Sequence, residues 1–597
     1  MKKIIELKKG WQTEIFSGSA KNFDLPLMLP AETINRNLVF RRNFTLSEGE
    51  GDEVYFLTLK YLSGTVTVWI DGRKAAVHSG MFAPFSCEIT PFIKKGRKQE
   101  LRLELQPVQT PARLYTFGAA EIACVNKSHF DLTAPAAMPL TVKTEFEGLI
   151  ANLFIDARIT LPNNYDVIQY QLFDPGGRLI VSQTAKPTSP QVCLSVAAPT
   201  LWDGTNPSYR YRLTATLRRD TAELDRAEIT FGLRDIRIGV NGIFYLNDLP
   251  SPLTGVTLPP RPFSPAETAA LTTLGCNSVL LESVFPGEKF LRFCDQKGIL
   301  VFFMFPYSDL PGGKDELQAT VRMLSSHPCV CFYGYRAQDV NLAKSFVTAV
   351  HAAKASVFTI GNTNVLYQES FSDSFPDILL LDADFTAESA SQTEFENRFL
   401  DVCRDHPDYR FAVFAAPPLP LCPPELDEDG FETVRPDDPK LEDETLTLWH
   451  ERLWEMFGGK KNVLAFFAGS LFDVSSPTQK TGLIGADRDD PRDCFRFYQA
   501  QFSAGGSLHI CRADDVYTTA KRLTVKCYSN QPRPVLLLRG KQRKKITCDM
   551  VADHVYIFRN LKLRRGNNTV VISAGGCADS TVFRRQKRKK STKLPNI

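Results

Sequence analysis

The spacing of hydrophobic positions changes twice along the chain. Up to about residue 237, and again after about residue 505, apolar and polar residues alternate, as in Gly64–Ile70, Leu101–Leu105 and Leu523–Asn530. Alternation with a period of two is typical of strands that have one buried face. Between these regions, short unbroken apolar runs alternate with stretches of helical spacing. The pattern predicts antiparallel β domains at both ends and a parallel α/β domain between them.

The middle region holds eight candidate parallel strands. They are residues 253–257, 278–281, 299–303, 326–338, 357–361, 378–382, 411–415 and 463–467. Helices are expected at 267–274, 287–296 and 446–457, and the acidic, proline-rich stretch 417–444 is expected to be a loop. Eight such strands over roughly 260 residues fit a (β/α)₈ TIM barrel, whose functional side chains gather at the carboxyl ends of the strands.

Composition is ordinary for a soluble globular protein. The chain has 597 residues, 43% of them hydrophobic and 23% charged, and it is too long for a single core. Charged residues interrupt the first nine positions, and no run approaches the ~18 apolar residues of a membrane span. We therefore expect a cytoplasmic protein of several domains that has no membrane partner.

The cysteines give little sign of a metal or cofactor site. None of the fourteen stands in a CxxC pair, and many lie in apolar runs, as Cys276 and Cys494 do, which favours reduced thiols in the core. Cys329 and Cys331 share one face of a strand, a weak metal signal. The HExxH, GxGxxG and P-loop motifs are missing too. No metal site and no cofactor are predicted.

The carboxyl-terminal segment is strongly basic. Residues 584–593 hold seven lysines and arginines and no acid, while the whole chain has a net charge of only +4. A run of this kind can contact anionic partners. Because it lacks apolar residues that would pack on a core, residues 585–597 are expected to form a disordered tail.

The fourth candidate strand carries the most specific motif. It begins Ser326-His327-Pro328-Cys329-Val330 and ends Tyr335-Arg336-Ala337-Gln338. The run resembles the H-P-S-V-x-x-W-S-x-G-N-E strand of glycoside hydrolase family 2, the β-galactosidase and β-glucuronidase family. Segments 66–85, 201–217, 482–502 and 523–541 resemble further motifs of that family, and they follow in the family's order. The resemblance covers residues from about 35 to 584.

The resemblance implies four domains. They are a sugar-binding-like jelly roll at 1–130, an immunoglobulin-like sandwich at 131–237, a TIM barrel at 238–505 and a C-terminal immunoglobulin-like β-sandwich at 506–584. Trp202 is expected to be packed rather than to be a sugar platform, and Trp69 is a candidate core residue. His327 is expected to be a turn residue of the fold and not a base.

The resemblance also implies where the hydrolytic carboxylates should stand. A retaining glycosidase needs two, about 5–5.5 Å apart, one as nucleophile and one as acid and base. The family's acid/base glutamate matches Gln338, whose amide has no proton to donate at neutral pH. Its nucleophile matches Ala415, whose methyl group cannot form a glycosyl ester. Family positions that contact sugar fall on Leu280, Met304 and Ala468.

A relocated catalytic pair is the alternative. Five carboxylates stand at or near predicted strand ends: Glu282, Asp309, Asp339, Asp382 and Asp384. Acidic residues on loops are usually only solvated. No Ser/His/Asp motif offers another catalytic set.

Three functions remain open from the sequence. The first is a catalytically inactive carbohydrate-binding or regulatory pseudoenzyme. The second is a structural or assembly partner of an active paralogue, and the third is an active O-glycosyl hydrolase with relocated carboxylates. Carbohydrate is the expected ligand, and a homo-oligomer is compatible with all three.

Overall fold

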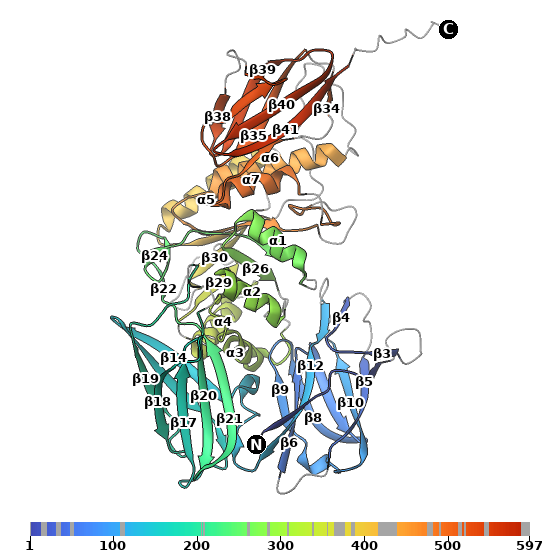
Figure 1. The fold of residues 1–597 in the computed structure, drawn as a ribbon, viewed down its shortest axis with the longest axis vertical. Helices are drawn as coiled ribbons and strands as arrows, with labels where there is room; N and C mark the ends of the chain where they lie inside the picture. Colours follow the sequence, from blue (N-terminus) through green and yellow to red (C-terminus); the bar gives the residue numbers. More distant parts are fainter. Residues whose placement is uncertain are drawn as a thin grey trace. The chain divides into compact units, whose positions relative to one another are not determined.

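A computed structural model confirms the predicted fold class: antiparallel β domains flank a parallel eight-stranded barrel (Figure 1). The structure describes residues 2–586 except 14–20, 31–36, 48–52, 108–113, 205, 207–208, 259–262, 283–286, 307–309, 337–339, 355, 363–375, 384–388, 416–438, 474–480, 489–490, 512–515, 519–520 and 543–547. It divides into two compact units, one made of residues 1–252, 260–263 and 278–381 and the other of residues 253–259, 264–277 and 382–597. No helix among the described residues is long and apolar enough to span a membrane.

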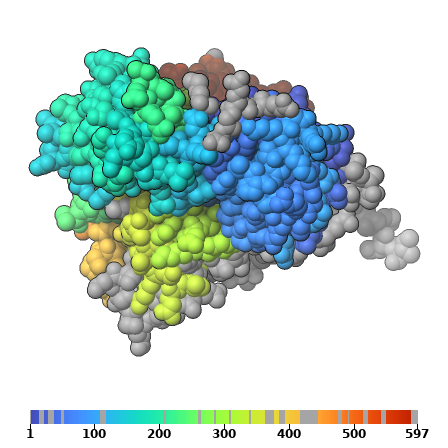
Figure 2. All heavy atoms as spheres, turned by 90° about the horizontal axis from the view of Figure 1, so that it is seen from below, coloured from blue at the N-terminus to red at the C-terminus, as the bar shows by residue number. Residues whose placement is uncertain are grey.

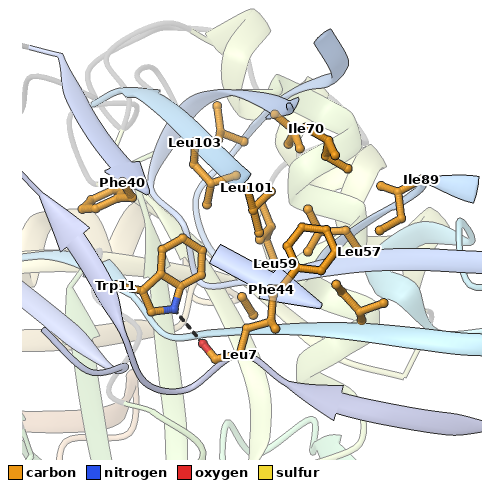
Figure 3. Packing of buried hydrophobic residues seen from close by; sticks show 14 of the residues in the cluster. Leu7, Trp11, Phe40, Phe44, Leu57, Leu59, Ile70, Ile89, Leu101 and Leu103 are labelled. Carbon is orange, nitrogen blue, oxygen red and sulfur yellow. Dashed lines mark hydrogen bonds between the residues drawn. The ribbon is translucent and has the colours of Figure 1, made fainter. Parts of the chain in front are cut away.

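The amino-terminal region consists mainly of two antiparallel sheets around one core. The first sheet has the order β1 (Lys3–Glu6), β12 (Ala119–Asn126), β6 (Glu53–Lys60) and β9 (Phe85–Glu88). The second has the order β3 (Lys21–Phe23), β2 (Trp11–Thr13), β5 (Leu38–Thr45), β10 (Lys98–Gln106), β7 (Gly64–Ile70) and β8 (Arg73–Gly80), and β11 (Leu114–Phe117) pairs with β4 (Leu27–Pro30). Trp11 lies in the core, and its indole N–H donates to the Leu7 carbonyl at 2.6 Å (Figure 3).

Alternation along β7 follows the predicted pattern. Val66, Val68 and Ile70 are buried, and the residues between them are only half-buried. Trp69 therefore lies on the outer face and is not a core residue. Its indole N–H donates at 2.9 Å to the carboxylate of Glu104, which belongs to the neighbouring strand β10.

The second region is a sandwich of a three-stranded sheet and a four-stranded sheet. One has the order β14 (Leu140–Glu147), β15 (Ile150–Ala157) and β19 (Val192–Ala197), and the other β18 (Leu179–Ala185), β17 (Val167–Phe173), β20 (Tyr211–Arg219) and β21 (Ala222–Phe231). A short pair, β13 (His129–Phe130) and β16 (Ile159–Thr160), joins them, and the sheet of β22 (Ile236–Ile238), β23 (Phe244–Leu246) and β24 (Leu249–Pro250) follows. Figure 2 shows this region in teal beside the blue amino-terminal region.

Trp202 is packed, as expected. It is fully buried, and its indole N–H donates at 2.8 Å to the carbonyl of Asp295, which belongs to a helix of the barrel. The sandwich is thereby fixed to that helix. The expectation that Trp202 serves packing rather than sugar binding is consistent with this contact.

The barrel closes in sequence order. Its strands are β25 (Leu253–Leu258), β26 (Ser278–Glu282), β27 (Leu300–Phe305), β28 (Val330–Tyr335), β29 (Phe358–Asn362), β30 (Ile378–Ala383), β31 (Phe411–Ala415) and β32 (Val463–Ser470). The helices are α1 (Pro265–Leu274), α2 (Glu288–Lys297), α3 (Gly313–Leu324), α4 (Val340–Ala353), α5 (Ser389–Asp405), α6 (Pro439–Phe457) and α7 (Asp493–Phe502).

The fourth strand occupies Val330–Tyr335 within the stretch 326–338, and His327 lies in the turn before it, as predicted. One predicted helix boundary is wrong. Helix α6 begins at Pro439 and not at 446. Proline is tolerated in the first turn of a helix, where its missing N–H is not needed, so the acidic, proline-rich composition concealed this start.

The carboxyl-terminal region is again a β-sandwich. One sheet has the order β33 (Leu508–Ile510), β35 (Arg522–Ser529), β39 (Val555–Lys562) and β38 (Cys548–Ala552). The other has the order β34 (Val516–Thr518), β41 (Cys577–Arg585), β40 (Gly566–Ala574), β36 (Val535–Leu538) and β37 (Lys541–Gln542). Arg584 and Arg585 belong to β41, so the predicted tail cannot begin at either of them. Residues 587–597 lie outside the described residues, and the other domain limits stay predictions.

Candidate functional site

Ala415 is the last residue of β31, where the resemblance places the nucleophile. Its side chain is 1% exposed. Gly469 of the neighbouring strand β32 lies against it, because a Cβ at position 469 would stand 3.5 Å from the Cβ of Ala415 and 3.0 Å from its carbonyl oxygen. The φ of Gly469 is +85°, a conformation that glycine adopts without strain. The end of β31 therefore presents a methyl group packed beside a glycine, and no carboxylate.

The side chains of β28 alternate between the helices and the barrel interior. Tyr335 packs on Phe346 of α4, with 4.6 Å between the ring centroids, and so faces the helices. Because neighbouring residues of a strand point to opposite faces, Gly334 and Arg336 face the interior. Phe332 lies on the same face and stacks on Phe302 of β27 at 3.9 Å.

A methionine fills the interior above this aromatic layer. Met304 of β27 is buried and pairs in register with Gly334. A Cβ at position 334 would collide with Sδ of Met304, so the thioether lies directly over the glycine. The resemblance places the acidic end of the third strand near Met304, and Leu280 and Ala468 are buried as well. Three positions matched to sugar contacts are thus apolar and inaccessible.

Glu282 is a candidate carboxylate that forms an ion pair in the structure. It ends β26 and forms an ion pair with Arg336, with 2.8 Å between Oε1 and Nη2. Each side chain is 35% exposed. Arg336 stands two residues before Gln338 and was not singled out from the sequence, although its inward position follows from the alternation along β28.

The other candidates are only partly accounted for. Asp382 lies near the end of β30 and is half-buried. Gln338, Asp309, Asp339 and Asp384 lie outside the described residues. Within the described part of the chain, no group of three His, Cys, Asp or Glu side chains is arranged to hold a metal ion.

Comparison with known proteins finds relatives and structural neighbours that are glycosidases. No family model matches the chain. A β-glucuronidase of Bacteroides fragilis is 19% identical over 610 residues, covering 87% of this chain and 83% of the relative. The crystal structure of an FMN-binding β-glucuronidase from Facaelibacterium prausnitzii L2-6 superposes with a TM-score of 0.82 at 19% identity and 99% coverage of both chains.

A glycosyl hydrolase family 2 member from Bacteroides cellulosilyticus DSM 14838 superposes with a TM-score of 0.70 at 16% identity, covering 98% of this chain and 85% of the other. This chain has the fold of glycoside hydrolase family 2. Its homologues and structural neighbours are the β-glucuronidases and β-galactosidases of that family. The resemblance inferred from the fourth strand is confirmed, whereas the replacement of the catalytic residues stays a prediction.

Proposed function

We propose that this chain is a carbohydrate-binding pseudoenzyme with the family 2 fold, and that it does not hydrolyse glycosides. The observation that carries the proposal is Ala415, buried against Gly469 at the end of β31. A retaining glycosidase of this fold forms a covalent intermediate through a carboxylate. A methyl group offers no such oxygen, so the covalent route has no nucleophile at this position.

The contacts of Glu282 argue against a replacement nucleophile. Its Oε1 accepts from both Nε and Nη2 of Arg336, at 2.9 and 2.8 Å. Ester formation through either oxygen would neutralise the carboxylate and so weaken the charge-assisted hydrogen bonds from Arg336. Met304 lies beside Glu282 on the neighbouring strand and supplies no proton. Glu282 is therefore assigned to holding Arg336.

The binding part of the proposal rests on the relatives and on Arg336. Its relatives are named as β-glucuronidases and β-galactosidases, so their substrates are sugars. Arg336 faces the barrel interior and is partly exposed, and a guanidinium presents N–H donors that suit hydroxyl and carboxylate oxygens. With three matched contact positions apolar, we expect dissociation constants in the millimolar range.

The proposal is tested by binding and turnover on the same preparation. Methyl β-glucuronide and methyl β-galactoside are titrated by calorimetry, and nitrophenol release is followed with the matching nitrophenyl glycosides. Weak binding without saturable turnover is expected, and Arg336→Gln should weaken that binding. Arg398→Gln, which breaks an exposed pair with Glu394 on α5, is the control and should bind as the wild type does. Turnover that disappears in Glu282→Gln would overturn the proposal, and so would the absence of binding to every sugar.

A further inference from the structure

A cavity of about 840 Å³ lies in the first unit, on the sandwich side of the barrel. The sheet of β14, β15 and β19 forms one wall through Phe154, Gln191 and Cys193. The last turns of α3 and α4 form the other wall. Helix α4 leads into the amino end of β29, so this cavity is at the opposite end of the barrel strands from Arg336, which directly follows the carboxyl end of β28. It is therefore separate from the site matched to glycoside hydrolysis.

The cavity is lined by an excess of basic side chains. Its charged and titratable residues are Lys143, Asp156, Arg158, Cys193, Arg322, His351 and Lys354. The single carboxylate, Asp156, accepts a hydrogen bond from the Gln191 amide at 2.9 Å. Lys143 pairs with Glu145, and His351 lies 3.6 Å from Asp377. The cavity is thus lined by four cationic side chains and one carboxylate, that of Asp156, which accepts its hydrogen bond from an uncharged amide.

Three of these cations have no acidic partner among the residues that the structure describes. No ion pair involves Arg158, Arg322 or Lys354 in that part of the chain. Burial and, to a smaller extent, the positive charge of Arg234 together lower the pKa of Lys354 to about 8. Arg234 itself donates to the Val330 carbonyl at 2.9 Å. The ammonium of Lys354 is consequently desolvated and beside a like charge, an arrangement that an anion would relieve.

We infer that this cavity binds a small organic molecule through an oxyanion group, phosphate or carboxylate, held by Lys354 and Arg322. Cavities of this volume hold ligands of drug size. The apolar side chains of Pro139, Val142 and Phe154 also line it and offer contact surface for the uncharged part of such a ligand. Guanidinium and ammonium groups are the usual partners of phosphate and carboxylate oxygens.

The test measures thermal stability and calorimetric binding of the full chain in a buffer without oxyanions. The probes are sulfate, glucose 6-phosphate, glucuronate and, as the uncharged control, glucose. Sulfate and the two charged sugars should raise the melting temperature, and glucose should not. Whether the phosphate or the carboxylate sugar binds more tightly tells which oxyanion the site prefers.

Three variants test whether sulfate binds in this cavity. Lys354→Met should raise the melting temperature without ligand, because it removes a half-buried cation that stands near Arg234, and it should weaken sulfate binding about tenfold or more, the loss expected for one charged hydrogen bond. Arg322→Gln should weaken binding with little change in stability, which keeps the test valid if Lys354→Met folds poorly. Lys314→Met, an exposed position of α3 outside the cavity, is the control and should behave as the wild type.

The pH dependence distinguishes binding at Lys354 from binding elsewhere. Sulfate keeps its charge across the relevant range, so wild-type affinity should fall about tenfold from about pH 7 to about pH 9 as Lys354 loses its proton. Lys354→Met should lose that dependence. The inference is wrong if no charged probe binds, or if both cavity variants bind sulfate as tightly as Lys314→Met. Neither result bears on Ala415, so failure here leaves the pseudoenzyme proposal untouched.

Discussion

Two N–H groups of Arg336 converge on one oxygen of Glu282, with Nε at 2.9 Å and Nη2 at 2.8 Å from Oε1. The residues are separated by 54 positions in sequence: Glu282 ends β26 and Arg336 directly follows β28, with β27 between the two strands. The pair spans Met304, the buried side chain of that middle strand. Glu282 is one of the carboxylates that could form a relocated catalytic pair, and the structure shows it paired with Arg336.

The first prediction concerns the stability of this pair. Glu282→Gln and Arg336→Gln should each lower the free energy of unfolding by about 1 kcal/mol or less, the range of partly exposed ion pairs. The double variant should lose little more than either single one, because both remove the same interaction. Urea unfolding of the four proteins measures this. A catalytic carboxylate often costs stability, so a gain in stability on Glu282→Gln would favour a relocated site.

Glu316 of α3 gives a second prediction. Its Oε1 accepts from the backbone N–H groups of Met81, Phe82 and Ala83, at 2.9, 2.6 and 2.9 Å, and the side chain is buried. Glu316→Ala leaves three donors unsatisfied, each costing about 1–3 kcal/mol, so unfolding free energy should fall by several kcal/mol. Glu316→Gln keeps a carbonyl acceptor and should lose less.

The matched control for Glu316 is its exposed neighbour Asp315, also in the first turn of α3. Asp315→Ala should change urea unfolding only slightly. If Glu316→Ala unfolded at the same urea concentration as Asp315→Ala, the carboxylate would not be what holds residues 81–83 to the helix.

A third prediction is a pH dependence centred on His327. Burial alone would lower the pKa of His327, but hydrogen bonds from its ring to Asp295 and Glu288 outweigh burial and raise it. The bond to His327 in turn lowers the pKa of Glu288 to about 2. A raised histidine pKa stabilises the fold fully below the unfolded value of about 6.5 and loses that effect as pH rises.

The expected result is that wild type loses stability relative to His327→Gln as pH rises above about 6.5. From about pH 4.5 downwards, Glu288 should lose its stabilising contribution as well, because its pKa is depressed in the folded state. Urea unfolding of both proteins over this range measures the difference. A constant difference across pH would mean that His327 is not charged in the folded protein.

A fourth prediction concerns the carboxyl terminus. Truncation after Gln586 should leave the melting temperature nearly unchanged, because residues 587–593 hold no apolar residue and only Leu594 and Ile597 follow them. Truncation after Phe583 is the comparison. It removes Arg584, which donates to Asn567 at 2.8 Å, and Arg585, which donates to the Leu563 carbonyl at 3.0 Å, and it should lower the melting temperature. A drop of several degrees for the shorter truncation would show that the tail packs on the sandwich.

The fold was accessible from the sequence because its signals are local. Alternation in Gly64–Ile70 and the unbroken apolar run after Pro328 each specify a strand within a few residues. The order of the family motifs along the chain then indicated the architecture of glycoside hydrolase family 2 among the folds that contain similar strands. The start of α6 was missed because proline within an acidic stretch is typical of a loop, although proline is also tolerated in the first turn of a helix.

The candidate site was only partly accessible, for a different reason. Ala415 is identified by its place in a motif, and the structure adds its close approach to Gly469. The partner of Glu282 depends on the register of three strands, which no local pattern fixes. The basic cavity depends on residues of a sandwich and of two barrel helices, such as Asp156 and Lys354, so it appears only once the chain is folded.

The most direct test of the central claim is covalent trapping. A mechanism-based aziridine of the kind bound covalently to a Bacteroides uniformis β-glucuronidase, and its galactose-configured analogue, are incubated with the purified chain before intact-mass measurement. Trace contamination by another glycosidase can release nitrophenol but cannot modify the bulk of this protein. We predict an unchanged mass with both reagents, because Ala415 has no oxygen to alkylate. Stoichiometric addition of one reagent, lost in Glu282→Gln or mapped to any other carboxylate of the barrel, would contradict the account.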